Sequence, residues 1–194
     1  MSDPIAEALQ AILDQRTKEG HVDTSGAVEA AKQQYPRFNN LPLSLSVGVG
    51  PGFSETYFPD DPENPQPGKL NVQLRDPKAI KNKSQWPDDV SLEAIHGLQD
   101  TDPKYQKFTQ SFVHSMTREQ MAAARHAYER DKKEFGTTES FQKWLPRVQA
   151  QEYIRGMLFT KAIPNWVGPE GEGQYTPAQM NLGAQIERYL KSSH

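Results

Sequence analysis

The chain has 194 residues, a net charge of -3, only 35% apolar residues and a mean hydropathy of -0.81. One domain is the default at this length, and so polar a chain predicts a thin core, with part of its apolar surface outside the core or buried on a partner. The absence of cysteine excludes disulfides, thiolate catalysis and cysteine-ligated zinc.

Charge and hydropathy also limit the class of partner. The net charge is too small to indicate nucleic acid or an anionic membrane, although residues 102–162 carry +4 and the remainder carries -7. No apolar run approaches the ~18–20 residues that span a bilayer. The N-terminus lacks the basic-then-apolar layout of a secretion signal. We therefore expect neither a membrane nor a nucleic acid as partner, and no secretion by a signal peptide.

Residues 1–47 predict two helices and a short strand. A one-faced apolar pattern follows Pro4 and stops at Gly20, which indicates a first helix. A second helix is expected over residues 25–34. Alternation of apolar and small residues over 43–47 is typical of a strand.

Residues 48–69 are expected to form a Pro/Gly-rich arm or loop. Five prolines exclude regular structure across most of this segment, and loops of this length are uncommon in compact domains unless they are functional or disordered. One interpretation is a flexible linker. The other is an extended arm that lies on another protein, with Phe53, Tyr57 and Phe58 as binding anchors.

Residues 70–194 predict a strand, at 70–74, followed by a helical domain. Helix starts are indicated by possible caps and by two capping boxes: Asp88 or Asp89, Asp102-Pro103, Thr117-x-x-Gln120 and Thr176-Pro177-x-Gln179. A short helix over 137–145 should be broken by Pro146 before another helix at 147–159. The expected fold class is mainly α (α+β), with a helical C-terminal two-thirds, a small two-stranded β element and a long Pro-rich extended segment.

One fragment resembles a catalytic signature. The zinc-protease motif H-E-x-x-H places two histidines one helical turn apart on a metal, and its glutamate activates the metal-bound water. Here Glu93 and His96 stand at the matching relative positions, but Leu92 occupies the first ligand position and cannot bind zinc. The alternatives are an active metallopeptidase with His96 as a metal ligand, a zincin-like relative without catalysis, and a helix that carries these residues by chance. We expect no cofactor, and no small-molecule substrate is indicated.

Arg155 is the other candidate binding residue. It falls in a mostly apolar predicted helix, where a charge usually needs a partner. The alternative is an arginine whose stem lies on apolar surface while its head reaches solvent.

The order and spacing of several short pieces in the second half resemble an uncharacterised family of tailed-phage and prophage proteins, over roughly residues 60–190. These pieces are Thr101-Asp102-Pro103, Phe112 with Ser115-Met116-Thr117-x-x-Gln120, Tyr128-Glu129-Arg130, Ser140-Phe141-x-x-Trp144, Tyr153-Ile154-Arg155-Gly156-x-Leu158-Phe159 and Tyr175-Thr176-Pro177-x-Gln179. None of them is a catalytic motif, so the resemblance implies a phage context and no site residues. It implies a structural, virion-associated or assembly protein in the host cytoplasm or the virion, with phage proteins or copies of itself as partners.

Overall fold

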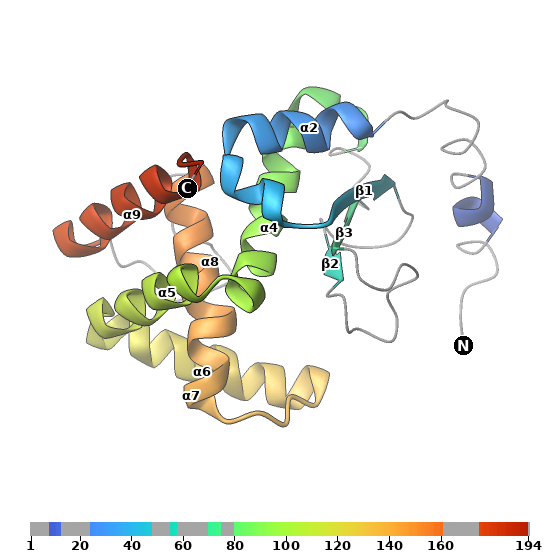
Figure 1. Ribbon diagram of the computed structural model, residues 1–194. Helices are drawn as coiled ribbons and strands as arrows, with labels where there is room; N and C mark the ends of the chain where they lie inside the picture. Colours follow the sequence, from blue (N-terminus) through green and yellow to red (C-terminus); the bar gives the residue numbers. More distant parts are fainter. Residues whose placement is uncertain are drawn as a thin grey trace. The chain divides into compact units, whose positions relative to one another are not determined.

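The computed structural model describes residues 8–12, 24–47, 55–57, 70–74, 80–160 and 175–193. Within these residues the chain is mainly helical and carries one small sheet (Figure 1), which confirms the predicted mainly α class with a small β element. The sheet has three strands and not the predicted two, and most of the Pro-rich segment lies outside the described residues. The chain divides into two compact units. The first unit is residues 1–97 with 190–194, and the second unit is residues 98–189.

The first unit contains a three-stranded sheet. Its strands are β1 (Leu43–Val47), β2 (Glu55–Tyr57) and β3 (Leu70–Leu74), with β3 in the middle. β1 pairs with β3 in parallel, Leu45 opposite Val72, whereas β2 pairs with β3 antiparallel. Both predicted strands are therefore present. β2 is a third strand inside the stretch that was expected to be irregular across most of its length.

The helix α2 (Ser25–Gln34) supplies small side chains to the core of this unit, and its predicted bounds are confirmed. A 3-10 turn, η1 (Pro36–Asn40), follows it. The core combines buried residues of α2, of two strands and of α4: Ala27, Val28, Ala31, Leu45, Val47, Val72, Trp86 and Val90. Leu45 and Val47 belong to it because alternate side chains of a strand point to the same face.

The helix α4 (Trp86–Thr101) begins earlier than its acidic residues indicated. The predicted cap at Asp88 or Asp89 is wrong, because the helix starts directly after the 3-10 turn η2 (Lys83–Gln85). Pro87 is tolerated in a first helical turn, where its missing N–H would have no intrahelical partner in any case. The two carboxylates lie in that first turn instead, where negative charge interacts favourably with the helix dipole.

The second unit is helical, and α5 (Pro103–Ser115) opens it at the predicted cap. The Asp102 carboxylate accepts hydrogen bonds from the backbone N–H groups of Lys104, at 2.8 Å, and Tyr105, at 3.0 Å. Two aromatic residues of this helix, Tyr105 and Phe112, are fully buried.

Both predicted capping boxes are present, at the starts of α6 (Arg118–Phe135) and α9 (Pro177–Leu190). In the first, the Gln120 N–H donates to Thr117 Oγ1 at 3.2 Å and the Thr117 N–H donates to Gln120 Oε1 at 3.0 Å. The second repeats this pattern with the same two distances. Each box satisfies backbone donors that the first helical turn would otherwise leave without partners.

The glutamines of the two boxes also bond to each other, which the sequence did not indicate. Gln179 Nε2 donates to Gln120 Oε1 at 2.7 Å and Gln120 Nε2 donates to Gln179 Oε1 at 3.3 Å. Gln179 Nε2 also lies 3.2 Å from the Ser115 carbonyl oxygen, at the end of α5. Both side chains are buried. One amide pair therefore ties the N-termini of α6 and α9 to the C-terminus of α5.

One helical segment runs through the middle of the second unit and contacts α5 (Figure 1). It consists of α7 (Phe141–Trp144), the π-turn η3 (Leu145–Gln149), α8 (Ala150–Arg155) and a second π-turn, η4 (Gly156–Thr160). The prediction that Pro146 breaks the helix is wrong. Proline cannot donate the usual bond and its ring clashes with the carbonyl four residues earlier. The wider π-turn shifts the hydrogen bonding by one residue, so the helix continues past the proline.

The glycine that ends α6 permits a direct test of this helix terminus. Gly136 has φ 67, in the left-handed region that residues with a Cβ rarely adopt. Gly136→Ala should lower the free energy of unfolding by about 1 kcal/mol. Gly26→Ala, in α2 with an ordinary φ and open space around its Cα, should instead be neutral or stabilising by up to about 1 kcal/mol. Urea denaturation followed by far-UV circular dichroism measures both, and two shifts of the same sign would contradict the expectation.

Candidate functional site

The predicted pair of Glu93 and His96 lies on α4. Glu93 Oε2 and His96 Nε2 are 3.9 Å apart, since residues three apart on a helix share a face. Glu93 is buried, whereas the His96 side chain is 17% exposed. The distance exceeds that of a hydrogen bond, so the two groups are electrostatic neighbours and not a bonded acid–base pair.

The donors around this pair do not fit a zinc site. Zinc in proteins takes at least three N, O or S ligands at about 2.0–2.3 Å. Among the described residues, no three His, Asp or Glu side chains come together closely enough to hold a metal ion. The described histidines outside this motif, His114 and His126, are exposed on α5 and α6. Within the described residues, the pair Glu93 and His96 is therefore not accompanied by a complete set of zinc ligands.

The predicted anchors of the arm fall largely outside the described residues. Phe53 and Phe58 both lie there. Tyr57 is the last residue of β2, and its backbone is paired with Asn71 of β3. The interpretation of residues 48–69 as a binding arm thus stays a prediction.

Arg155 lies at the end of α8 beside a buried carboxylate. Its Nη1 is 3.4 Å from Glu152 Oε2, and the side chains of Arg155 and Glu152 are 27% and 9% exposed. The same Glu152 charge acts on Tyr105: burial raises the pKa of the Tyr105 hydroxyl, and the negative charge of Glu152 raises it further. Arg155 supplies a cation that pairs with this buried carboxylate, and the ion pair explains why an otherwise apolar helix carries an arginine.

Removing Arg155 should destabilise the second unit. Arg155→Ala leaves Glu152 buried without this ion pair, and we expect a loss of about 1–2 kcal/mol in the free energy of unfolding, because partial exposure screens the interaction. Arg188→Ala is the matched control, an exposed arginine on α9 whose loss should cost less than about 0.5 kcal/mol. Urea denaturation at pH 7 compares the two. Equal losses would show that the ion pair contributes nothing specific.

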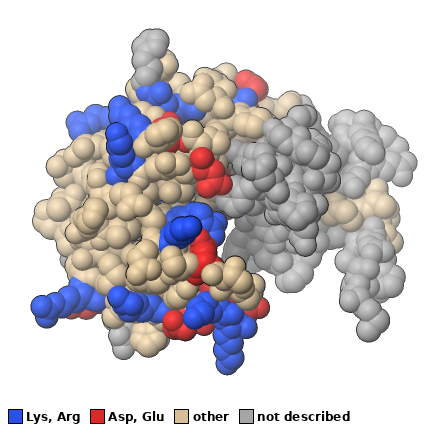
Figure 2. Space-filling model, turned by 60° about the horizontal axis from the view of Figure 1, so that its bottom comes forward, with Lys and Arg blue, Asp and Glu red and all other residues tan. Residues whose placement is uncertain are grey.

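The basic residues of α6 do not form a stripe of one sign. Arg125 lies over the ring of Phe141, at 4.7 Å, and Lys132 Nζ is 3.8 Å from the carboxylate of Glu129. Figure 2 shows Lys and Arg side chains interleaved with Asp and Glu on the face it presents. A phosphate-binding surface usually presents clustered, uncompensated cations, so these side chains are better explained as solvated helix faces.

One exposed aromatic residue was missed as a site candidate. Phe135, the last residue of α6, is 77% exposed. It follows Tyr128 by seven residues, two helical turns, and so continues the face of α6 that packs in the core. The signal was present in the helical spacing.

No helix in the described ranges is both long and apolar enough to cross a membrane. Comparison with known proteins gives no match, whether with the models of protein families, with curated proteins or with solved structures. The function of this chain must therefore be inferred from its own residues.

Proposed function

We propose that this chain is a structural or assembly protein of a tailed phage or prophage, and that it acts by contact with protein chains. Its partners would be copies of itself or other phage proteins, in the host cytoplasm during infection, in the virion, or in both. The sequence resemblance over residues 60–190 supports the phage context. The observation that carries the contact role is the exposure of Phe135, where the packed face of α6 continues into solvent.

The energetic argument concerns one large side chain. Fully burying a phenylalanine is worth about 1.5–3 kcal/mol, and 77% of Phe135 is available for burial on a partner. Aromatic side chains often carry a large share of interface energy. Single exposed apolar residues are common on monomers. The role of Phe135 is therefore tested by its effect on assembly and not by its exposure.

The experiment is native mass spectrometry of the intact chain, purified without chelators. A metal-free oligomer that is weakened in Phe135→Ala but kept in Lys133→Ala would support contact through the end of α6, since Lys133 is the exposed charged neighbour. An oligomer unaffected by Phe135→Ala would support assembly through another surface. A metal-free monomer would reject self-association and leave other phage proteins as the partner.

The alternative proposal is a zincin-like hydrolase, or an inactive relative of one, with Glu93 and His96 at the site. Only their proximity, 3.9 Å, favours it. Stoichiometric zinc in the same mass spectra would support it, and Glu93→Gln would then test catalysis. Absence of bound zinc together with unchanged behaviour of Glu93→Gln would reject the catalytic form.

A further inference from the structure

The strand β1 of the first unit lies at an edge of the sheet, and side chains bond to its outer side. β1 pairs with β3 along one edge only. On the other side, the Leu45 carbonyl oxygen accepts from Thr24 Oγ1 at 2.9 Å. The Val47 carbonyl oxygen accepts from Gln10 Nε2 at 3.3 Å. Because the N–H and C=O groups of alternate strand residues point to opposite edges, Leu45 and Val47 both turn their backbone groups away from β3.

The sequence of β1 does nothing to prevent pairing with a further strand. Edge strands usually carry lysine, proline or a bulge that keeps other strands away. β1 reads Leu-Ser-Leu-Ser-Val and has neither a charge nor a proline. Leu45 and Val47 are only 6% and 2% exposed, so this edge is covered. Its protection therefore comes from other parts of the chain, and Thr24 and Gln10 are the side chains that bond to its carbonyl oxygens.

Both covering contacts are polar. In residues 8–12, which are helical, Leu9 and Ile12 are 47% and 49% exposed. They lie three residues apart and share one face, whereas Gln10 points away from that face and reaches Val47. Thr24 stands at the N-cap of α2, but its side chain makes no capping bond there. Polar contacts of this kind can be exchanged for other hydrogen bonds at small net cost.

We propose that the outer edge of β1 is a strand-pairing site for a second copy of this chain, and that Gln10 and Thr24 keep this edge closed. Strand addition at a sheet edge is a recurring mode of recognition in which backbone hydrogen bonds supply affinity. The carbonyl oxygens of Leu45 and Val47 exchange a side-chain donor for a backbone N–H of the second copy. The proposal rests on the contact role proposed above. It adds a surface in the first unit, whereas Phe135 belongs to the second.

The sequence of β1 is complementary to a copy of itself. A two-fold axis at Leu45 sets the two strands antiparallel. Leu43 then lies opposite Val47 of the second copy, and Ser44 likewise faces Ser46. Every cross-strand pair joins two aliphatic side chains or two serines, which are favourable neighbours on a sheet, and no like charges meet. A symmetric interface requires such self-complementarity, so a second copy is the partner that this strand favours.

The test opens the edge and measures self-association of the full chain. The double variant Gln10→Ala with Thr24→Val removes both covering donors. It should associate at least about tenfold more tightly than the wild type in sedimentation velocity, because two bonds no longer compete with pairing. Gln33→Ala with Thr138→Val is the matched control at exposed positions outside β1, and it should associate as the wild type does. Either single change at the edge should act in the same direction, so one variant that fails to fold leaves the other as the test.

Hydrogen exchange identifies the surface that pairs. The backbone amides of Leu45 and Val47 should exchange more slowly in the associated double variant than in the same variant diluted to monomer. This protection should persist when Phe135→Ala is added. Unchanged association, or tighter association without protection of these two amides, overturns the proposal. If the wild-type oligomer is weakened by Phe135→Ala while the double variant gains nothing, the contact role stands and only pairing through β1 is rejected.

Discussion

Replacing Gln179 by alanine is expected to lower the free energy of unfolding of the second unit by about 3 kcal/mol. The Gln179 side chain accepts from the Thr176 N–H, bonds reciprocally to Gln120, and donates to the Ser115 carbonyl oxygen. A net contribution of about 1 kcal/mol from each hydrogen bond that is lost accounts for this decrease in the free energy of unfolding. The buried amide left on Gln120 adds a further cost, because its usual partner is gone.

Gln185→Ala is the matched control for this change. Gln185 lies on the same helix as Gln179 but is exposed, so its loss should stay within about 0.5 kcal/mol. A double-mutant cycle with Gln120→Ala isolates the amide pair, and we expect a coupling free energy of about 1–2 kcal/mol. Urea denaturation of the wild type, the three variants of the cycle and Gln185→Ala, followed by far-UV circular dichroism, measures both quantities. Additive losses would show that each glutamine only caps its own helix.

The capping boxes mark the limit of what this sequence predicts about its fold. A box spans four residues, so spacing alone located the starts of α6 and α9 correctly. The bond between Gln120 and Gln179 joins positions 59 apart, and only the packing of the helices brings them together. Local signals therefore identified the elements, while the contact that joins them depends on tertiary structure.

The two incorrect predictions of secondary structure, at Pro146 and at the start of α4, have the same origin. Pro146 follows a reliable local rule against helix, but packing on α5 and α6 favours continuing the segment through a π-turn. The α4 start was misplaced because Asp88 and Asp89 are as favourable in a first turn as at a cap. For the candidate site, spacing placed Glu93 and His96 on one face, but the two zinc ligands besides His96 would be long-range contacts that no local pattern reveals.

The second large effect is expected at Trp144, whose replacement by alanine should lower the free energy of unfolding by about 4 kcal/mol. The indole is 1% exposed and packs against three other buried residues: Ala124, Ala127 and Leu145. The tyrosine ring of Tyr128 lies 5.4 Å away. Two of these neighbours are alanines on α6. Their small side chains leave the space that the indole occupies, and they could not fill that space if the indole were removed.

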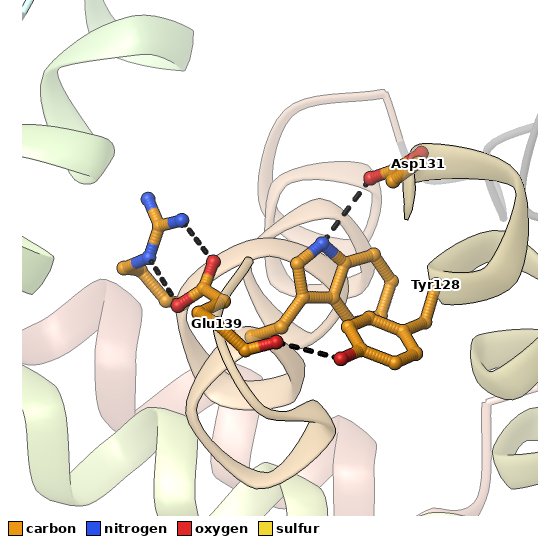
Figure 3. A network of polar contacts seen from close by, with 5 residues as sticks. Tyr128, Asp131 and Glu139 are labelled. Carbon is orange, nitrogen blue, oxygen red and sulfur yellow. Dashed lines mark hydrogen bonds and ion pairs between the residues drawn. The ribbon is translucent and has the colours of Figure 1, made fainter. Parts of the chain in front are cut away.

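The polar contacts around the indole orient it. Its N–H donates to Asp131 Oδ2 at 3.2 Å, and the Tyr128 hydroxyl donates to the Glu139 backbone oxygen at 2.6 Å (Figure 3). The Glu139 carboxylate is in turn paired with Arg147. Trp144→Phe keeps an aromatic ring but loses the indole N–H and part of the volume. We therefore expect it to cost about 1–3 kcal/mol, less than the change to alanine.

Phe135→Ala is the control that separates folding from contact. Phe135 lies on α6, as do Tyr128 and Asp131, but it is 77% exposed, so its removal should change the free energy of unfolding by less than about 0.5 kcal/mol. Thermal and urea unfolding of Trp144→Ala, Trp144→Phe and Phe135→Ala should therefore rank the losses in that order. If Phe135→Ala were as costly as Trp144→Ala, the end of α6 would be packed within the isolated chain. The proposal that Phe135 is kept for a partner would then lose its basis. If Phe135→Ala leaves stability intact and weakens the oligomer, α6 has two separate roles: its buried alanines pack against Trp144 of α7, and its exposed last residue, Phe135, contacts a partner.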